Sequence, residues 1–121
     1  MNTATMTGNL TRDPETRFLA DGTATTNFSI AVNRRYMSHG EWTEQTSFFD
    51  VVAWRDLGEH VALSLAKGDR VTVTGYMEQR TWTTAEGDKR SRIELVAEDI
   101  GVSLKFQALA NANSEQISAD F

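Results

Sequence analysis

Residues 48–82 read FFDVVAWRDLGEHVALSLAKGDRVTVTGYMEQRTW, and this stretch carries the strongest secondary-structure signals in the chain. Both of its ends are rich in β-branched and aromatic residues, which favour strands. Its middle predicts a helix near residues 57–66, with Asp56 as the N-cap and Gly68 just beyond the end. The apolar stripe of that helix recurs with helical spacing and consists of Leu57, Val61, Leu65, Ala62 and Ala66. The stretch therefore predicts strand, helix and strand in that order.

Turn signals divide the remainder of the chain into further strands. They are Asp13-Pro14, Asp21-Gly22, His39-Gly40, Lys67-Gly68 and Glu86-Gly87-Asp88. The segments between them predict strands near 3–12, 24–35, 45–54, 69–82 and 90–97, with a further extended piece near 102–106. Three strands, a helix and two strands predict an all-β protein with the OB-fold, a five-stranded barrel with one helix and extended β-hairpins.

The OB-fold domain is expected to span residues 1–106. Residues 107–121 are rich in Ala, Asn and Ser and are predicted to form a short C-terminal tail. The N-terminus has neither a basic segment nor an apolar one, so we expect no signal peptide. No apolar run is long enough to span a membrane. We therefore expect a cytoplasmic protein.

Two strands show which side chains point outward. In 69–82 the alternate residues Val71, Val73 and Gly75 are expected in the core, which leaves Tyr76 and Trp82 outside among polar groups. In 48–54 both faces are apolar. Such a strand is either buried on both sides or covered by a partner or ligand. Its two faces are Phe49, Val51 and Ala53 on one side, and Phe48, Val52 and Trp54 with Asp50 on the other.

Composition argues against several classes of function. The chain has 121 residues, no cysteine and a net charge of −5, so disulfides and thiolate metal sites are excluded and the surface is not uniformly basic. His39 and His60 are expected to be solvated surface residues. No catalytic, metal-binding or phosphate-loop motif is present. We therefore expect neither an enzyme nor a cofactor.

Aromatic and basic residues instead alternate around the hairpins. Tyr36 and Trp42 flank a hairpin tip next to Arg34-Arg35, and Phe48 and Trp54 share a strand face. Arg80 and Trp82 lie opposite an arm that carries Lys89, Arg90 and Arg92. This pattern is typical of single-stranded nucleic-acid binding, because bases stack on rings while cations follow phosphates. The alternative for Phe48 and Trp54 is that both are ordinary core residues.

The stretch Gly8-Asn9-Leu10-Thr11-Arg12-Asp13-Pro14-Glu15-Thr16-Arg17 resembles a signature of bacterial single-stranded DNA-binding proteins (SSB). Further matches follow in family order over about residues 3–106, including Phe28–Asn33, Trp54–Leu57, Leu65–Val71 and Gly75–Met77. The closing segment, Glu98–Leu104, is most similar to the actinobacterial branch.

This resemblance implies a homotetramer that binds single-stranded DNA without strong sequence preference, in replication, recombination and repair. It also implies a nucleoid-associated location. The stacking positions of the family match Tyr36, Phe48, Trp54 and Trp82, and its phosphate-facing positions match Arg35, Lys67, Arg80 and Arg90. Glu78 and Asp56 stand where many relatives have a basic residue. For the tetramer, Phe49, Val51, Thr3, Thr5 and Thr7 are expected to form the association surface.

The end of the chain resembles a shortened form of the family's acidic tip. Asp120 and Phe121 are therefore expected to bind replication and repair enzymes. The long linker of the family is missing, and its absence suggests a short-tailed paralogue or a mobile-element copy. Two other functions stay open. One is an OB-fold module for RNA or protein partners in replication restart; the other is a structural oligomerisation module.

Overall fold

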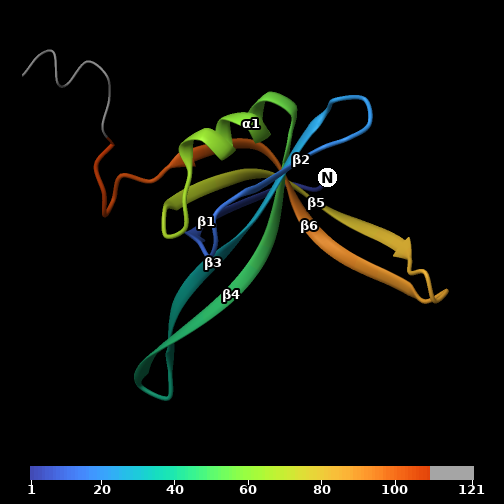
Figure 1. Ribbon diagram of the computed structural model, residues 1–121. Coiled ribbons are helices and arrows are strands. Elements are labelled where there is room, and N and C mark those ends of the chain that lie inside the picture. Colours follow the sequence, from blue (N-terminus) through green and yellow to red (C-terminus); the bar gives the residue numbers. More distant parts are fainter. Residues whose placement is uncertain (110–121) are drawn as a thin grey trace, which may run out of the picture.

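The computed structural model describes residues 1–109. Six strands and one helix follow each other along the chain (Figure 1). They are β1 (Ala4–Leu10), β2 (Glu15–Phe18), β3 (Ala24–Ser38), β4 (Glu41–Trp54), α1 (Arg55–Ser64), β5 (Arg70–Thr83) and β6 (Lys89–Val102).

The sheet closes into a barrel because β1 pairs with two strands. Along Ala4–Asn9 it pairs with β5, and at Asn9 and Leu10 it also pairs with β3. The order β1-β5-β6-β4-β3 then returns to β1, with β2 added beyond β3. Only β4 and β6 run parallel, with Val51 beside Leu95 and Val52 beside Val96. This is the five-stranded barrel that the sequence predicts, with β2 as an addition.

The core fills the barrel and extends under α1. Phe28, Ile30, Val71, Val73 and Leu95 are fully buried. They are the inward residues of β3, β5 and β6, so the alternation predicted for residues 69–82 is confirmed. From α1 and the loop after it, Val61 and Leu65 join the same core, while Ala62 and Ala66 are exposed. The predicted stripe of the helix is therefore too wide.

Two glycines allow backbone segments to approach closely. A Cβ on Gly75 would lie 1.9 Å from the Val96 carbonyl oxygen, at the point where the register of β5 and β6 shifts. A Cβ on Gly58 would lie 2.5 Å from the Ala53 carbonyl oxygen, so the glycine lets α1 pack against the end of β4. A side chain at either position would clash with the backbone of the neighbouring segment.

The boundaries of several elements differ from the prediction. The helix begins at Arg55, and Asp56 makes no capping hydrogen bond. The short strand β2 was not predicted, because Asp13-Pro14 and Asp21-Gly22 together indicate a long loop there. The extended piece near 102–106 is the end of β6 followed by irregular chain. The tight β2–β3 turn is stabilised by Asp21, whose pKa is lowered by hydrogen bonds from Thr23.

Two hairpins extend beyond the barrel as separate arms (Figure 1). One is the outer half of β3 and β4, which turns at His39 and Gly40; both have positive φ. The other is the outer half of β5 and β6, which turns through Gly87, also at positive φ. The extended β-hairpins predicted from the sequence are present, and both are longer than predicted. They leave the barrel in different directions, below α1 in the view of Figure 1.

Candidate nucleic-acid interface

The exposed side of the sheet, turned away from the core, is called the outer face here. The registers of β2, β3, β4, β6 and β5 make it continuous, since paired residues point to the same side. Its main side chains come from three strands: Phe48, Asp50, Val52 and Trp54 from β4; Arg90, Arg92, Glu94 and Val96 from β6; and Tyr76, Glu78, Arg80 and Trp82 from β5.

The β4 part of this face carries two exposed rings. Phe48 is 68% exposed and Trp54 is 43% exposed, so the alternative that both are core residues is wrong. The opposite side of the same strand faces the core, where Val51 and Ala53 are buried. Val52, between the two rings, is 5% exposed and lies beside Val96 as the floor of the face. The two-sided apolar pattern of β4 thus combines a core side with a surface of exposed rings.

The β5–β6 arm adds a third ring. Trp82 is 41% exposed, and the guanidinium of Arg80 lies 5.5 Å from the centre of its ring. Arg90 is its cross-strand partner, and both line a shallow pocket with Lys89 at the end of the arm. A ring that is held by a cation and open to solvent on one side is a platform on which a base can stack.

The β3–β4 arm carries the outward pair Arg35 and Trp42. Trp42 is 65% exposed, and the Arg35 guanidinium lies 5.3 Å from the centre of its ring. Trp42 lies on the same side of β4 as Phe48, since even-numbered residues of that strand point outward. The family motifs in the sequence did not single out Trp42 as a site residue. The sequence feature that identifies Trp42 is its even-numbered position on the strand, which it shares with Phe48 and Trp54.

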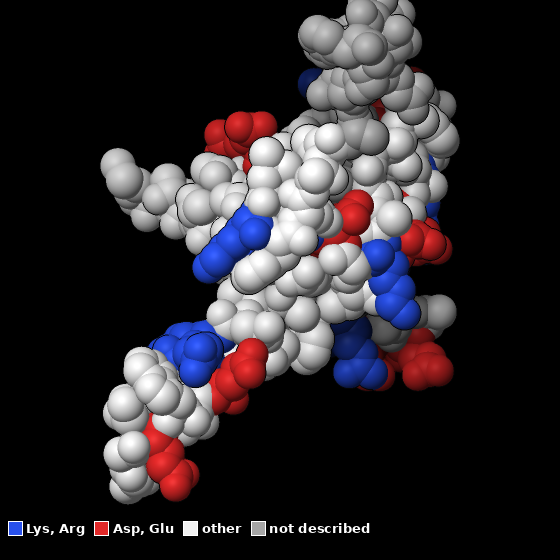
Figure 2. Space-filling view, turned by 90° about the vertical axis from the view of Figure 1, so that its left-hand side faces the viewer, with Lys and Arg blue, Asp and Glu red and all other residues white. Residues whose placement is uncertain are grey.

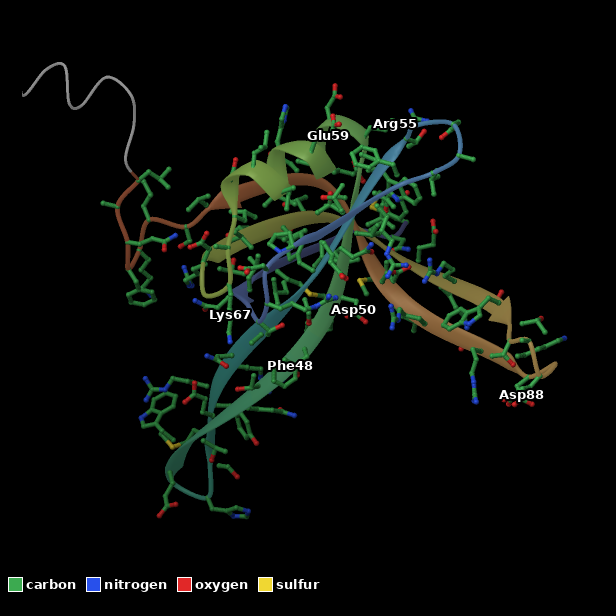
Figure 3. The ribbon with its side chains drawn as sticks, in the orientation of Figure 1. Phe48, Asp50, Arg55, Glu59, Lys67 and Asp88 are labelled. Atoms are coloured by element: carbon green, nitrogen blue, oxygen red, sulfur yellow. The ribbon has the colours of Figure 1, made fainter. Side chains whose placement is uncertain are left out.

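Two predicted site residues lie away from this face. Tyr36 pairs with Thr43 on the core side of the β3–β4 hairpin, with the Arg34 guanidinium 5.2 Å from the centre of its ring. Lys67 belongs to the loop between α1 and β5, where its backbone N–H donates to Asp13. Figure 3 shows Lys67 on that loop, off the two arms. The structure brings neither residue together with Trp54 and Trp82.

A groove crosses the outer face near Trp54 and brings in β2. Arg17 and Phe18 of β2 line it together with Arg12 from the preceding loop. Phe18 is 65% exposed. These residues were missed as site residues because β2 was not predicted as a strand. Its pairing with β3 places Arg17 beside Thr25, which is the neighbour of Trp54.

Acidic residues are interspersed among the cations of this face. The Arg80 Nε lies 3.6 Å from the Glu94 Oε1, and the Arg92 Nε lies 3.6 Å from the Asp50 Oδ2. The pair of Arg90 and Asp88, at 4.0 Å, lies near the arm's tip. Figure 2 likewise shows blue and red groups interspersed on its face of the molecule. The face is thus locally basic without forming a continuous positive stripe.

The described residues contain no cluster of three or more metal-ligating side chains. No helix among them is long and apolar enough to cross a membrane. Asp120 and Phe121, the predicted partner-binding tip, lie outside the described residues. His39 and His60 are exposed, as predicted.

A closed five-stranded barrel with one helix and a face of exposed rings and arginines defines an OB-fold protein of the nucleic-acid-binding type. A solved structure titled "Plasmodium falciparum SSB complex with ssDNA" superimposes with a TM-score of 0.78 over 85% of this chain and 95% of that chain, at 22% identity. This likeness confirms the OB-fold.

The family follows from the sequence comparisons. The model of the single-strand binding protein family matches residues 1–103, and the chain belongs to this family. The single-stranded DNA-binding protein of Paenarthrobacter aurescens is 44% identical over 94% of this chain and 68% of its own length. Those of Mycolicibacterium smegmatis and Mycobacterium tuberculosis H37Rv are 43% and 42% identical, over 92% and 98% of this chain and 68% and 74% of their own lengths. The predicted family is therefore confirmed, and all three of these relatives come from actinobacteria.

Proposed function

We propose that this protein binds single-stranded DNA on its outer face without strong sequence preference, as a non-enzymatic protein. The observation that carries the proposal is the set of exposed rings Phe48, Trp54 and Trp82 on one continuous face. A soluble barrel would not leave three large rings in solvent for stability alone. Membership of the family supports the same ligand.

The roles of the proposed site residues follow from their places. Phe48, Trp54 and Trp82 stack with bases, and stacking tolerates any sequence because every base has a π face. Arg35, Arg80 and Arg90 contact phosphates from the two arms. Tyr36 and Lys67 contact the strand only where it passes round an edge of the sheet. Single strands are favoured over a duplex because paired bases cannot reach the rings.

The biological setting is inferred from the same ligand. We place the protein on exposed single strands during DNA replication, recombination and repair, in the cytoplasm at the nucleoid. The proposed binding and oligomerisation domain is residues 1–106, close to the matched range 1–103. The proposed tail, residues 107–121, recruits replication and repair enzymes through Asp120 and Phe121.

The proposed assembly is a homotetramer, but the predicted surface for it needs correction. Val51 is 1% exposed in the core and cannot take part, and Phe49 packs against the core from the same side of β4. The remaining candidate is β1. Among the described residues it pairs with β3 only at Asn9 and Leu10, so its Ala4–Thr7 portion has an edge without a strand partner. Such an edge is suited to pairing with a second copy.

Competition filter binding tests the function. The protein is bound to labelled oligo-dT and challenged with unlabelled oligo-dT, oligo-rU and duplex DNA. The proposal predicts competition by oligo-dT far ahead of duplex. Equal or better competition by oligo-rU would favour the RNA module, and no binding at low salt would favour the structural oligomerisation module.

A further inference from the structure

The three arginines of the β5–β6 arm, Arg80, Arg90 and Arg92, already have carboxylate partners in the protein. Arg80 is 60% exposed in its side chain, yet its Nε lies 3.6 Å from the Oε1 of Glu94, whose side chain is only 9% exposed. Arg92 is held in the same way by Asp50, at 3.6 Å. Both carboxylates lie on the two central strands of the outer face, between the rings of Trp54 and Trp82. Figure 3 shows Asp50 on β4.

The β3–β4 arm is built differently. Within the described part of the chain, Arg34 and Arg35 form no ion pair and lie instead over rings, those of Tyr36 and Trp42. A phosphate can approach Arg35 without displacing a carboxylate. On the other arm a phosphate has to compete with Glu94 for Arg80 and with Asp50 for Arg92.

The competition is strongest at Glu94. If Arg80 turns to a phosphate, the shielded carboxylate of Glu94 loses its partner, and an unpaired charge away from water is costly. Glu78 is the cross-strand neighbour of Glu94 and carries the same charge. Two carboxylates on adjacent strands then face each other without a cation between them, which is unfavourable.

We propose that Glu94 and Asp50 limit the affinity of the outer face by competing with DNA phosphates for Arg80 and Arg92. The carboxylates recover the two arginines as the strand leaves, so they speed its release. This inference rests on the proposed function, and Glu94 and Asp50 are the residues that limit how tightly DNA is bound. A protein of this kind binds through its rings and remains easily displaced from the strand.

The test compares Glu94→Gln and Asp50→Asn with Glu59→Gln in oligo-dT binding. All three remove one negative charge with little change of shape. Glu59 is the matched control because it lies on α1 and points away from the arms (Figure 3). At physiological salt the long-range effect of a distant charge is largely screened. Circular dichroism and thermal melting establish that each variant is folded.

We expect Asp50→Asn to tighten oligo-dT binding about two- to fivefold, the range typical of partly exposed ion pairs. Glu94→Gln is expected to exceed that, because its carboxylate is shielded, and the gain appears as slower dissociation in stopped-flow measurements. In an Arg80→Gln background, Glu94→Gln gives no gain.

Wild-type protein that fails to bind oligo-dT would contradict the proposed function itself. Wild-type binding with Asp50→Asn and Glu94→Gln no tighter than Glu59→Gln would overturn only the inference. If Glu94→Gln does not fold, the half-exposed Asp50 still decides the matter. A gain that persists in the Arg80→Gln background would mean that Glu94 acts through its charge in general and would also overturn the proposed competition.

Discussion

Trp54 stands at the junction of β4 and α1, where its backbone is extended and the next residue, Arg55, has a φ of 58°. The ring lies at the end of β4 and remains 43% exposed. Trp82 lies at the far side of the same face, on an arm away from the core. Neither ring belongs to the buried core, and each is therefore available to a ligand.

Trp54→Ala and Trp82→Ala are each expected to weaken oligo-dT binding by about 1–3 kcal/mol, the usual contribution of one stacked base. Fluorescence titration measures the loss, and circular dichroism should show an unchanged fold. Leu63→Ala is the control, since Leu63 is 86% exposed on α1. Loss of the fold in Trp54→Ala would contradict its assignment to the surface.

Tyr36 and Phe48 separate the motif-based assignment from the face seen in the structure. The family resemblance gives both a stacking role, but Tyr36 lies on the core side of its hairpin with Arg34 over the ring. We expect Phe48→Ala to weaken oligo-dT binding at least threefold more than Tyr36→Ala. Equal losses in parallel titrations would show that the strand contacts both sides of the arm.

Among the elements, the barrel is predictable because residues 69–82 alternate between apolar and polar side chains and most of the turns carry glycine. This alternation predicts Val71, Val73 and Gly75 on the inner side, where all three are buried. The short strand β2 is not predictable, since its four residues show no pattern of their own and it is defined by pairing with β3. For the same reason Arg17 and Phe18 were missed as parts of the groove.

The alternation of residues along a strand predicts which side chains share a face, but it does not predict which of the two faces is covered. The two apolar sides of β4 look alike in sequence, and only the burial of Val51 in the core and the exposure of Phe48 distinguish them. The ion pairs of Arg80 and Arg92 join different strands or hairpin arms, so the chain alone does not reveal them.

Gly75→Ala is expected to destabilise the barrel by at least about 1–3 kcal/mol, because its Cβ would lie 1.9 Å from the Val96 carbonyl oxygen and the strands have to move. Gly101→Ala is the control on β6, where a Cβ meets nothing within 4 Å. Urea denaturation compares the two variants. Similar midpoints would mean that the β5–β6 contact is not tight.

For the molecule as a whole, a net charge of −5 does not favour a polyanionic ligand. The rings resolve this, because stacking requires no positive charge. The arginines then contribute locally, and part of their charge is cancelled by Glu94, Asp50 and Asp88. Binding should therefore depend on salt only moderately.

The log–log slope of affinity against salt is expected to be about −0.7 for each phosphate neutralised on a single strand. With Arg35, Arg80, Arg90 and Lys67 as proposed contacts, the slope of one subunit should not exceed that of about four phosphates. Titrations with oligo-dT at several salt concentrations give this value. A flat response would mean that these cations do not reach phosphate.

A homotetramer has a mass of about 54 kDa, which is four times the 13.5 kDa of one chain. Light scattering at micromolar concentration should give this value. Thr5→Pro is expected to lower it, because proline in the open portion of β1 disrupts strand pairing there. A monomer mass for the wild-type protein would contradict the assembly, while a dimer would restrict it to pairing through one edge.

Ultraviolet crosslinking of the full chain to oligo-dT, followed by mass spectrometry of the peptides, identifies the residues that contact the bound strand. Rings that stack on thymine are the groups placed to react with it. We expect adducts on Phe48, Trp54 and Trp82, suppressed by excess unlabelled oligo-dT and unaffected by duplex DNA. Adducts confined to α1 or β1, with none on these three rings, would contradict the outer face as the binding surface.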